Sequence, residues 1–306
     1  MSAASRHRIE TVGGVELCVA ERGSGPPLLL LHGFTGSARS LDELAGGLAG
    51  THRVIVPDLV GHGDSDAPFE LAPYRMEHCV EQLCALLDAL ETGPVGVLGY
   101  SMGGRVALSL LEKAPERIRP ALLISAGAGI AEPEARAERV SSDEALARRI
   151  EEEGVAASVD AWLSQPLFAS QMRRLDAPAR KRTRDERLAN NAHGLANSLR
   201  GMGSGAQSPV HEALSTIACP VALVVGEEDE KFRRIAQDLA QRLPQGRVHC
   251  VPHAGHAVHL ENPGALLTVA LDHFTETAPR DAMHQNAARV VHERTPSSRG
   301  RESWHR

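Results

Sequence analysis

Short runs of aliphatic residues alternate with longer segments of helical period along the first 125 residues, and this alternation limits the possible folds more than any other feature. Four runs have the length and composition of strands, at positions 27–31, 54–57, 95–98 and 121–125. The segment 74–90 instead places its apolar residues three and four positions apart, as an amphipathic helix does. Strands that alternate with helices predict the α/β class, a mostly parallel sheet flanked by helices.

The alternation stops near residue 130 and resumes with a strand-like run at 221–225. Between them, residues 131–200 contain twelve Lys and Arg and twelve Asp and Glu, but no strand-like run. We therefore predict a core formed by residues 1–130 and 210–277, interrupted by a helical lid insert at 131–209. Residues 278–306 carry six arginines and almost no aliphatic periodicity, which predicts a disordered tail.

Composition argues against several classes of function. The net charge is −6 and the chain has nine aromatic residues, so no nucleic-acid partner is expected. Its apolar runs fall far short of the roughly 20 residues that span a bilayer, and residues 1–14 are too polar for a secretory signal. We expect a cytoplasmic protein without a membrane span. The five cysteines are scattered and are expected to be reduced and buried.

A Gly-x-Ser-x-Gly motif lies between the strand at 95–98 and a helical segment. The motif consists of Gly99, Ser101 and Gly103, and the helical run begins directly after it. A side chain at either glycine would crowd so sharp a turn, which presents the serine Oγ at the edge of the sheet. In this context the motif predicts a nucleophile elbow, with a glycine-softened turn as the alternative.

A serine hydroxyl needs a base that takes its proton, and the base needs a third group that orients it. Two later strands end in loops that carry such groups, with Asp229 after 221–225 and His256 after 247–251. Because the carboxyl ends of parallel strands meet at one edge, Ser101, Asp229 and His256 are predicted to form a catalytic triad in the chain order of an α/β-hydrolase. The rivals for the acid are Glu227, Glu228 and Glu230.

An oxyanion hole needs two fixed N–H donors, one of them from the residue after the serine. Met102 supplies that amide, and we assign the second to Phe34 in the turn after the strand at 27–31. His32 is expected to hold this turn, and the glycine-rich segment 58–65 to shape the same edge. His253 and His259 flank His256 at three-residue steps, but no aspartate or cysteine cluster completes a metal site, so we predict no metal.

Arg105 lies four residues after Ser101 and therefore one helical turn further on the same face. An arginine that points toward a buried serine must be paired, either with a structural carboxylate or with the substrate. The insert offers further arginines, at positions 136, 139, 182, 184 and 187. Several guanidinium groups around one pocket suit a small-molecule polycarboxylate substrate.

From about residue 27 to residue 274 the chain resembles the α/β-hydrolase superfamily, and five blocks are similar to one family within it. The blocks are 99–108 (GYSMGGRVAL), 136–143 (RAERVSSD), 162–170 (WLSQPLFAS), 187–191 (RLANN) and 226–232 (GEEDEKF). They resemble the 2-succinyl-6-hydroxy-2,4-cyclohexadiene-1-carboxylate synthases of menaquinone biosynthesis. Members of that family are lyases that use no cofactor.

The resemblance implies that the substrate is 2-succinyl-5-enolpyruvyl-6-hydroxy-3-cyclohexene-1-carboxylate and that pyruvate is eliminated from it. Ser101 then acts as a base activated by His256, and the oxyanion hole stabilises an enolate. The substrate carries three carboxylates, for which the resemblance implies Arg105, Arg139 and Arg187. It also places Tyr100 and Trp162 on the wall of the site.

Two alternatives remain open on the sequence. One is an esterase or a carbon–carbon bond hydrolase, because the same triad serves these reactions. Hydrolases of the second kind usually have an aromatic residue after the triad histidine, whereas Ala257 stands here. The other alternative is a non-catalytic protein that binds a small ligand.

Overall fold

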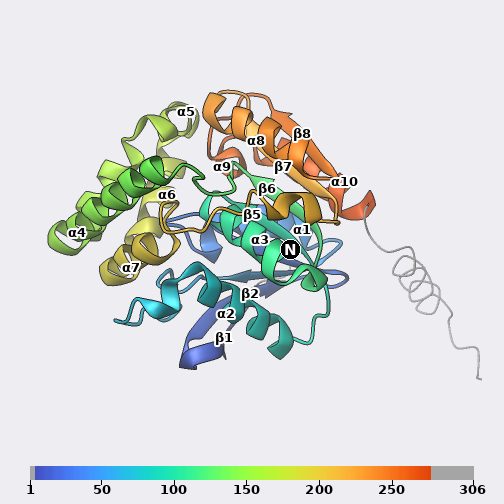
Figure 1. The fold of residues 1–306 in the computed structure, drawn as a ribbon, viewed down its shortest axis with the longest axis horizontal. Helices are drawn as coiled ribbons and strands as arrows, with labels where there is room; N and C mark the ends of the chain where they lie inside the picture. The colour runs from blue at the N-terminus through green and yellow to red at the C-terminus, as the bar shows by residue number, and fades with distance from the viewer. Residues whose placement is uncertain (1–3, 277–306) are drawn as a thin grey trace, which may run out of the picture.

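A single eight-stranded sheet organises the computed structural model, which describes residues 4–276 (Figure 1). The strand order is β1-β2-β4-β3-β5-β6-β7-β8. The strands are β1 (Ser5–Glu10), β2 (Glu16–Arg22), β3 (Pro27–Leu31), β4 (Arg53–Pro57), β5 (Val95–Tyr100), β6 (Ile118–Ile124), β7 (Val221–Gly226) and β8 (Gly246–Val251). All pairs from β4 to β8 are parallel, which confirms the predicted α/β class.

The sequence did not indicate the first two strands. β1 and β2 pair antiparallel with each other, and β2 pairs antiparallel with β4. β1 is mostly polar and exposed, as a strand at a sheet edge can be, so no aliphatic run marks it. The predicted tail at 278–306 lies outside the described residues.

Helices cover both faces of the sheet, and the alternation of side chains along the strands explains how. In β3, Leu29 and Leu31 contribute to a core under α2 (Met76–Ala89), α3 (Met102–Lys113) and α8 (Glu230–Arg242). Leu28 and Leu30 contribute to a second core under α1 (Asp42–Leu48) and α10 (Pro263–Glu276). Successive strand residues point to opposite faces, so both faces of the central strands are apolar and buried.

The chain leaves the sheet after β6 and returns at β7, and the intervening insert forms helices grouped on one side of the core (Figure 1). They are α4 (Pro133–Leu163), α5 (Ala169–Arg174), α6 (Ala177–Leu188) and α7 (Ala192–Met202). A small apolar cluster that includes Ile150 and Leu195 joins α4 to α7. α4 is interrupted at Gly154, whose φ of 80° no helix adopts.

Two further predictions concern the burial of the cysteines and the absence of a membrane-spanning segment. All five cysteines are free; Cys18 and Cys79 are buried, but Cys250 is exposed, so its predicted burial was wrong. Cys250 lies on β8, the last strand of the sheet, where one face is open to solvent. Among the residues that the structure describes, no helix combines the length and apolar character needed to cross a membrane.

Candidate active site

Ser101 occupies the sharp turn between the end of β5 and the start of α3. Its φ of 51° lies in the left-handed region, which a non-glycine residue rarely adopts. A Cβ on Gly103 would lie 2.2 Å from the carbonyl oxygen of Leu31, and one on Gly99 would lie 2.4 Å from that of Gly103. Neither position has room for a side chain, which explains the glycines of the motif. The turn therefore holds the Ser101 hydroxyl above the end of β5.

The structure brings Ser101, His256 and Asp229 together. His256 Nε2 lies 3.2 Å from Ser101 Oγ, and His256 Nδ1 lies 2.8 Å from Asp229 Oδ2. Asp229 and His256 are both buried. With Nδ1–H donating to the carboxylate, Nε2 is free to accept the serine proton. Asp229 Oδ1 also accepts from the Phe232 amide, at 3.2 Å, which fixes the carboxylate at the start of α8.

The rival acids have other partners. Glu228 pairs with Arg173 and Arg174 of α5, and Glu230 pairs with Arg234. Glu227 accepts from the backbone amide of His253, at 3.2 Å. Within the described chain, Asp229 alone of these acids contacts His256.

The two amides predicted for the oxyanion hole lie at the ends of neighbouring strands β3 and β5. Met102 is the first residue of α3, where a helix leaves its amides unpaired. Phe34 follows β3, and its ring packs edge-on against Trp162 of α4, with 5.1 Å between the ring centres. In residues 4–276 neither amide has a hydrogen-bond partner. Both N–H groups are therefore available to an oxygen atom of a ligand.

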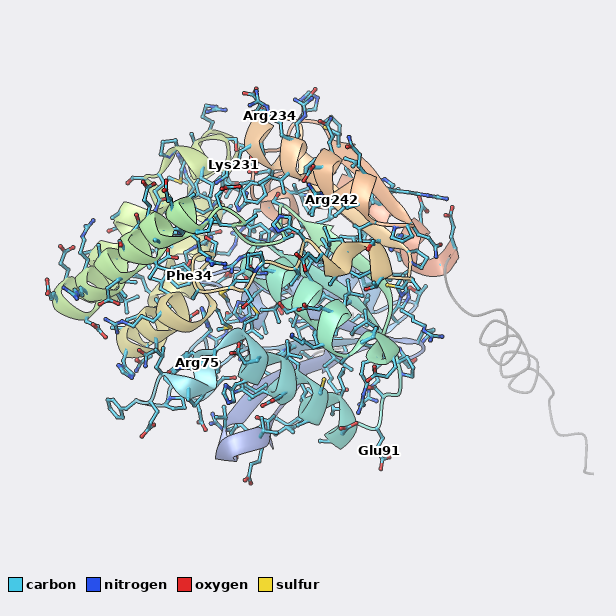
Figure 2. The ribbon with its side chains drawn as sticks, in the orientation of Figure 1. Phe34, Arg75, Glu91, Lys231, Arg234 and Arg242 are labelled. Carbon is cyan, nitrogen blue, oxygen red and sulfur yellow. The ribbon has the colours of Figure 1, made fainter. Side chains whose placement is uncertain are left out.

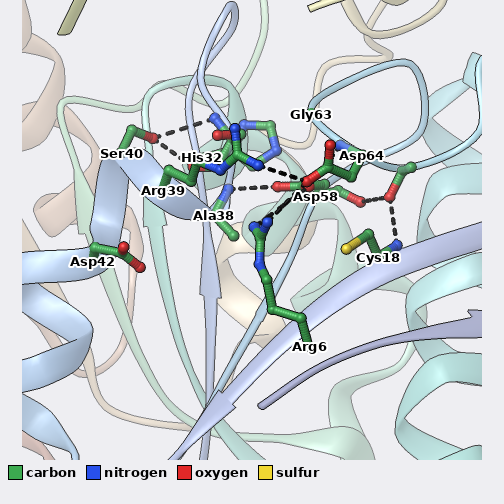
Figure 3. Close-up of polar contacts among 12 residues, drawn as sticks. Arg6, Cys18, His32, Ala38, Arg39, Ser40, Asp42, Asp58, Gly63 and Asp64 are labelled. Atoms are coloured by element: carbon green, nitrogen blue, oxygen red, sulfur yellow. Dashed lines mark hydrogen bonds and ion pairs between the residues drawn. The ribbon is translucent and has the colours of Figure 1, made fainter. Parts of the chain in front are cut away.

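Buried polar groups hold the turn that carries Phe34. His32 Nδ1 donates to the Gly33 carbonyl (2.9 Å), and its Nε2 accepts from the Leu59 amide (3.0 Å), while burial lowers the pKa of its imidazole. The buried Asp58 carboxylate accepts from the amides of Ala38 (2.6 Å) and Asp64 (2.9 Å), as Figure 3 shows. The segment 58–65 thus fixes the edge beside the site, as the sequence predicted.

A cavity of about 500 Å³ lies over Ser101, between the sheet edge and the insert. Ser101, Met102, Phe34 and His256 form part of its wall. The remaining lining includes residues from α3, the insert and α8: Arg105, Arg139, Trp162, Gln165, Ser204, Lys231 and Phe232. Three of these side chains carry a positive charge, and the lining has no carboxylate.

Arg105 carries a positive charge with no ion-pair partner among the described residues. Its Nη1 donates to the Met202 carbonyl (2.7 Å) and to Gln207 Oε1 (3.2 Å). Burial, and then the nearby charge of Arg139, lower its pKa to about 10. Arg139 itself pairs with Asp143, at 2.8 Å. The Asp143 charge acts on Arg105 in the opposite direction but makes its ion pair with Arg139. A buried cation that faces a cavity without an ion pair of its own marks a place for an anion.

Tyr100 and Arg187 lie behind the cavity rather than on its surface. The Tyr100 ring packs against the imidazoles of His256 and His259, and burial raises its pKa. Arg187 is buried and donates to the Thr183 carbonyl (2.9 Å) and to Thr35 Oγ1 (3.2 Å). In this structure Arg187 therefore connects α6 to the turn that carries Phe34.

Lys231 is a cavity-lining cation that the sequence analysis quoted in a motif but did not assign to the site. It lies in the first turn of α8, on the side toward the insert (Figure 2), two residues after Asp229. Its ammonium group lies 5.5 Å from the centre of the Phe232 ring and, in the described chain, has no ion-pair partner. Its position two residues after the acid of the triad was the signal that could have found it.

The histidines beside the triad do not form a metal site in residues 4–276. The one group there that brings three potential ligand atoms together is Cys18, Asp58 and Asp64, and it includes neither His253 nor His259. Arg6 already pairs with both of these aspartates (Figure 3). The predicted absence of a metal stays a prediction.

Because two histidines are buried, we expect the free energy of unfolding to fall steeply in mild acid. Burial lowers the pKa of His62 and of His259 to about 3, against an ordinary value near 6.5. The unfolded chain takes up these two protons between about pH 6.5 and 3 and the folded chain does not, so stability is lost as the pH falls through that range. From pH 7 to pH 5 we expect the free energy of unfolding to fall by about 2 kcal/mol for each histidine.

Urea denaturation at pH 7, 6 and 5 measures this slope. A His62→Asn variant cannot take up the proton and should lose about 2 kcal/mol less over the same range, whatever its stability at pH 7. Equal slopes in the variant and the wild type would show that His62 is not the group that titrates.

Comparison with known proteins identifies relatives over most of the chain. A model of the alpha/beta hydrolase fold family matches residues 26–263. A Bacillus subtilis (strain 168) protein, provisionally named a 2-succinyl-6-hydroxy-2,4-cyclohexadiene-1-carboxylate synthase, is 42% identical over 82% of this chain and 91% of its own length. The synthase of that name from Salmonella paratyphi C is 33% identical over 79% of this chain and 91% of its own length.

Solved structures of other proteins resemble this fold closely. The structure of MenH from S. aureus superposes with a TM-score of 0.81 and 29% identity, covering 85% of this chain and 98% of that one. A thermophilic esterase from Thermogutta terrifontis superposes with a TM-score of 0.79 and 27% identity, covering 90% of this chain and all of that one. The fold is therefore shared by MenH and by an esterase, so the fold alone does not decide the reaction.

Proposed function

Because the chain belongs to the alpha/beta hydrolase fold family and, within it, to the 2-succinyl-6-hydroxy-2,4-cyclohexadiene-1-carboxylate synthases, we propose that its cavity carries out their elimination of pyruvate. The substrate is 2-succinyl-5-enolpyruvyl-6-hydroxy-3-cyclohexene-1-carboxylate, and the reaction is a step of menaquinone biosynthesis. One observation carries the proposal beyond the family. The triad opens into a cavity whose wall carries three cationic side chains and no carboxylate.

We propose that Ser101 acts as a base. His256 Nε2 takes the serine proton, and Oγ removes the ring proton next to the succinyl carbonyl. The carbonyl oxygen gains negative charge, which the Phe34 and Met102 amides stabilise. The electron pair then forms a double bond between ring carbons 2 and 3, the existing double bond shifts to carbons 4 and 5, and the bond from carbon 5 to the enolpyruvyl oxygen breaks. The leaving group takes up a proton and becomes pyruvate, so no water is consumed.

The cations on the cavity wall would bind the carboxylates of the substrate. Arg105 presents a planar fork that suits a carboxylate, and Arg139 of α4 and Lys231 of α8 also line the cavity. The third carboxylate, which the resemblance gave to Arg187, has Lys231 as its candidate on the cavity surface. Arg187 would act through the Thr35 hydroxyl on the turn that carries Phe34.

Other parts of the proposal rest on the sequence. The insert would serve as a lid, since its residues form one wall of the cavity. A small-molecule substrate, the absence of a nucleic-acid partner and a cytoplasmic location remain predictions. They follow from composition and charge and from the class of reaction.

The decisive experiment offers the purified protein its enolpyruvyl substrate and a simple ester. We expect pyruvate, measured with lactate dehydrogenase, in equal amount to a conjugated diene whose mass is that of the substrate minus pyruvate. Hydrolysis of the enol ether would also release pyruvate but would leave a ring product heavier by one water. That product, or rapid turnover of the ester without pyruvate, would establish the hydrolase in place of the lyase.

A further inference from the structure

Glu261, at the end of the short helix α9 (Val258–Glu261), holds the loop that carries His256. Its side chain is fully buried. Oε2 accepts from the Gly255 amide (2.9 Å), and Oε1 accepts from the Ala257 amide (3.2 Å). These two residues are the chain neighbours of His256. One carboxylate therefore fixes the backbone on both sides of the triad histidine.

Arg174 joins this carboxylate to the insert. It lies at the end of α5, with Nε 3.8 Å from Glu261 Oε2, and its Nη2 donates to Glu228 Oε1. Glu228 directly precedes Asp229. A single guanidinium group thus bridges three segments: a helix of the insert, the loop of the triad acid and the loop of the triad histidine.

The backbone of the histidine loop also packs tightly against α5. A Cβ on Gly255 would lie 2.0 Å from Ser170 Oγ, so the loop and the helix touch at this point. Behind the loop, the Ser125 hydroxyl donates to the His256 carbonyl, at 3.0 Å. The loop is held from two sides, and one of those sides belongs to the insert.

We propose that Glu261 is a positioning residue for His256 and that Arg174 couples it to the insert, so that the base is correctly placed only when α5 is seated on the histidine loop. The position of His256 decides how well it takes the Ser101 proton, and displacements near 1 Å can cost roughly a hundredfold in rate. The carboxylate does not reach the cavity surface, so its removal should affect kcat and not substrate binding. This inference depends on the proposed function only for the identity of the substrate.

The test compares Glu261→Gln, Arg174→Met and their double variant with Arg173→Met. The glutamine oxygen can accept a hydrogen bond from one of the two backbone amides, but its NH2 group is itself a donor and cannot accept from the other. We therefore expect kcat to fall about thirtyfold, with KM within threefold of wild type. Arg174→Met should lower kcat about fivefold, and the double variant should be no slower than Glu261→Gln, because both act through one network. Arg173 pairs with Glu228 but not with Glu261 and is largely exposed, so its variant should retain wild-type kcat.

A spectroscopic readout separates positioning from mere stability. The proton between His256 Nδ1 and Asp229 gives a low-field resonance in proton NMR, which we expect to broaden or disappear in Glu261→Gln and to persist in Arg173→Met. If Glu261→Gln does not fold, Arg174→Met carries the same test. Wild-type kcat and an unchanged resonance in the folded variants would overturn the inference, as would a loss confined to KM. A wild-type protein that releases no pyruvate would contradict the proposed function, while the resonance would still test the positioning.

Discussion

Replacement of Ser101 by alanine is expected to lower kcat/KM by roughly a thousandfold or more while leaving the fold intact. The hydroxyl is the group in the turn that can pass the ring proton to His256, whose Nε2 lies 3.2 Å away. Alanine tolerates the same backbone as serine there, and it leaves the Gly99 and Gly103 contacts unchanged. The measurement is pyruvate release in single-turnover and steady-state assays, with circular dichroism as the check on folding.

Members of a triad act as a unit, so a Ser101→Ala/His256→Ala double variant should be about as slow as the slower single variant. Ser141→Ala, at an exposed serine of α4, should leave the rate unchanged and serves as the matched control. A Ser101→Ala protein that keeps a tenth of the wild-type rate would show that another group removes the proton.

The triad could be predicted because each of its members follows a strand. Strand ends at 98, 225 and 251 are visible as the limits of aliphatic runs, and parallel strands bring these ends together. The elbow could be predicted because so sharp a turn has no room for side chains beside the serine. The structure shows this requirement at Gly99 and Gly103. β1 escaped prediction for the opposite reason, since an edge strand with polar residues leaves no hydrophobic pattern. β2 has an apolar run, at 17–20, but this run is short and charged residues stand at both ends of the strand.

The residues of the insert were harder to place, because helical spacing gives the face of a residue but not the direction in which that face points. Arg105 lies on α3 one turn from Ser101, so its position followed from the elbow. Arg187 lies on α6, and the packing of that helix turns it toward Thr35 and away from the cavity surface. Lys231 reaches the cavity because α8 starts immediately after the triad acid, so its closeness to Asp229 could be read from the sequence even though the direction of its side chain could not.

The same reasoning explains why Glu261 was not found from the sequence. A glutamate five residues after the triad histidine resembles any solvated residue of a helix. Its importance depends on a four-residue helix that folds the chain back, so that the carboxylate meets the amides of residues 255 and 257. A buried carboxylate with two backbone donors and a nearby arginine is a property of the fold.

Removal of the unpaired cation should separate substrate recognition from proton transfer, and we expect Arg105→Met to lower kcat/KM by roughly ten- to a hundredfold. A charge-assisted hydrogen bond is worth about 1.5–3 kcal/mol, which corresponds to that range. The side chain now donates to the Met202 carbonyl and to Gln207, weak substitutes for an anion, and burial lowers its pKa. Arg105→Lys keeps the charge but loses the planar fork, so it should fall between wild type and Arg105→Met.

The matched control is Arg182→Met, at an exposed arginine of the insert, which should stay within twofold of wild type. Lys231→Met should lose less than Arg105→Met, because its ammonium group is exposed and water screens its attraction for a carboxylate. All rates come from the pyruvate assay, and binding of the diene product, titrated by calorimetry, gives the affinity without turnover. If Arg105→Met binds the product and turns over the substrate as wild type does while Ser101→Ala is inactive, the cavity does not recognise carboxylates through Arg105. The substrate's charges would then have to meet Arg139 and Lys231 alone, since these are the other cations on the described cavity wall.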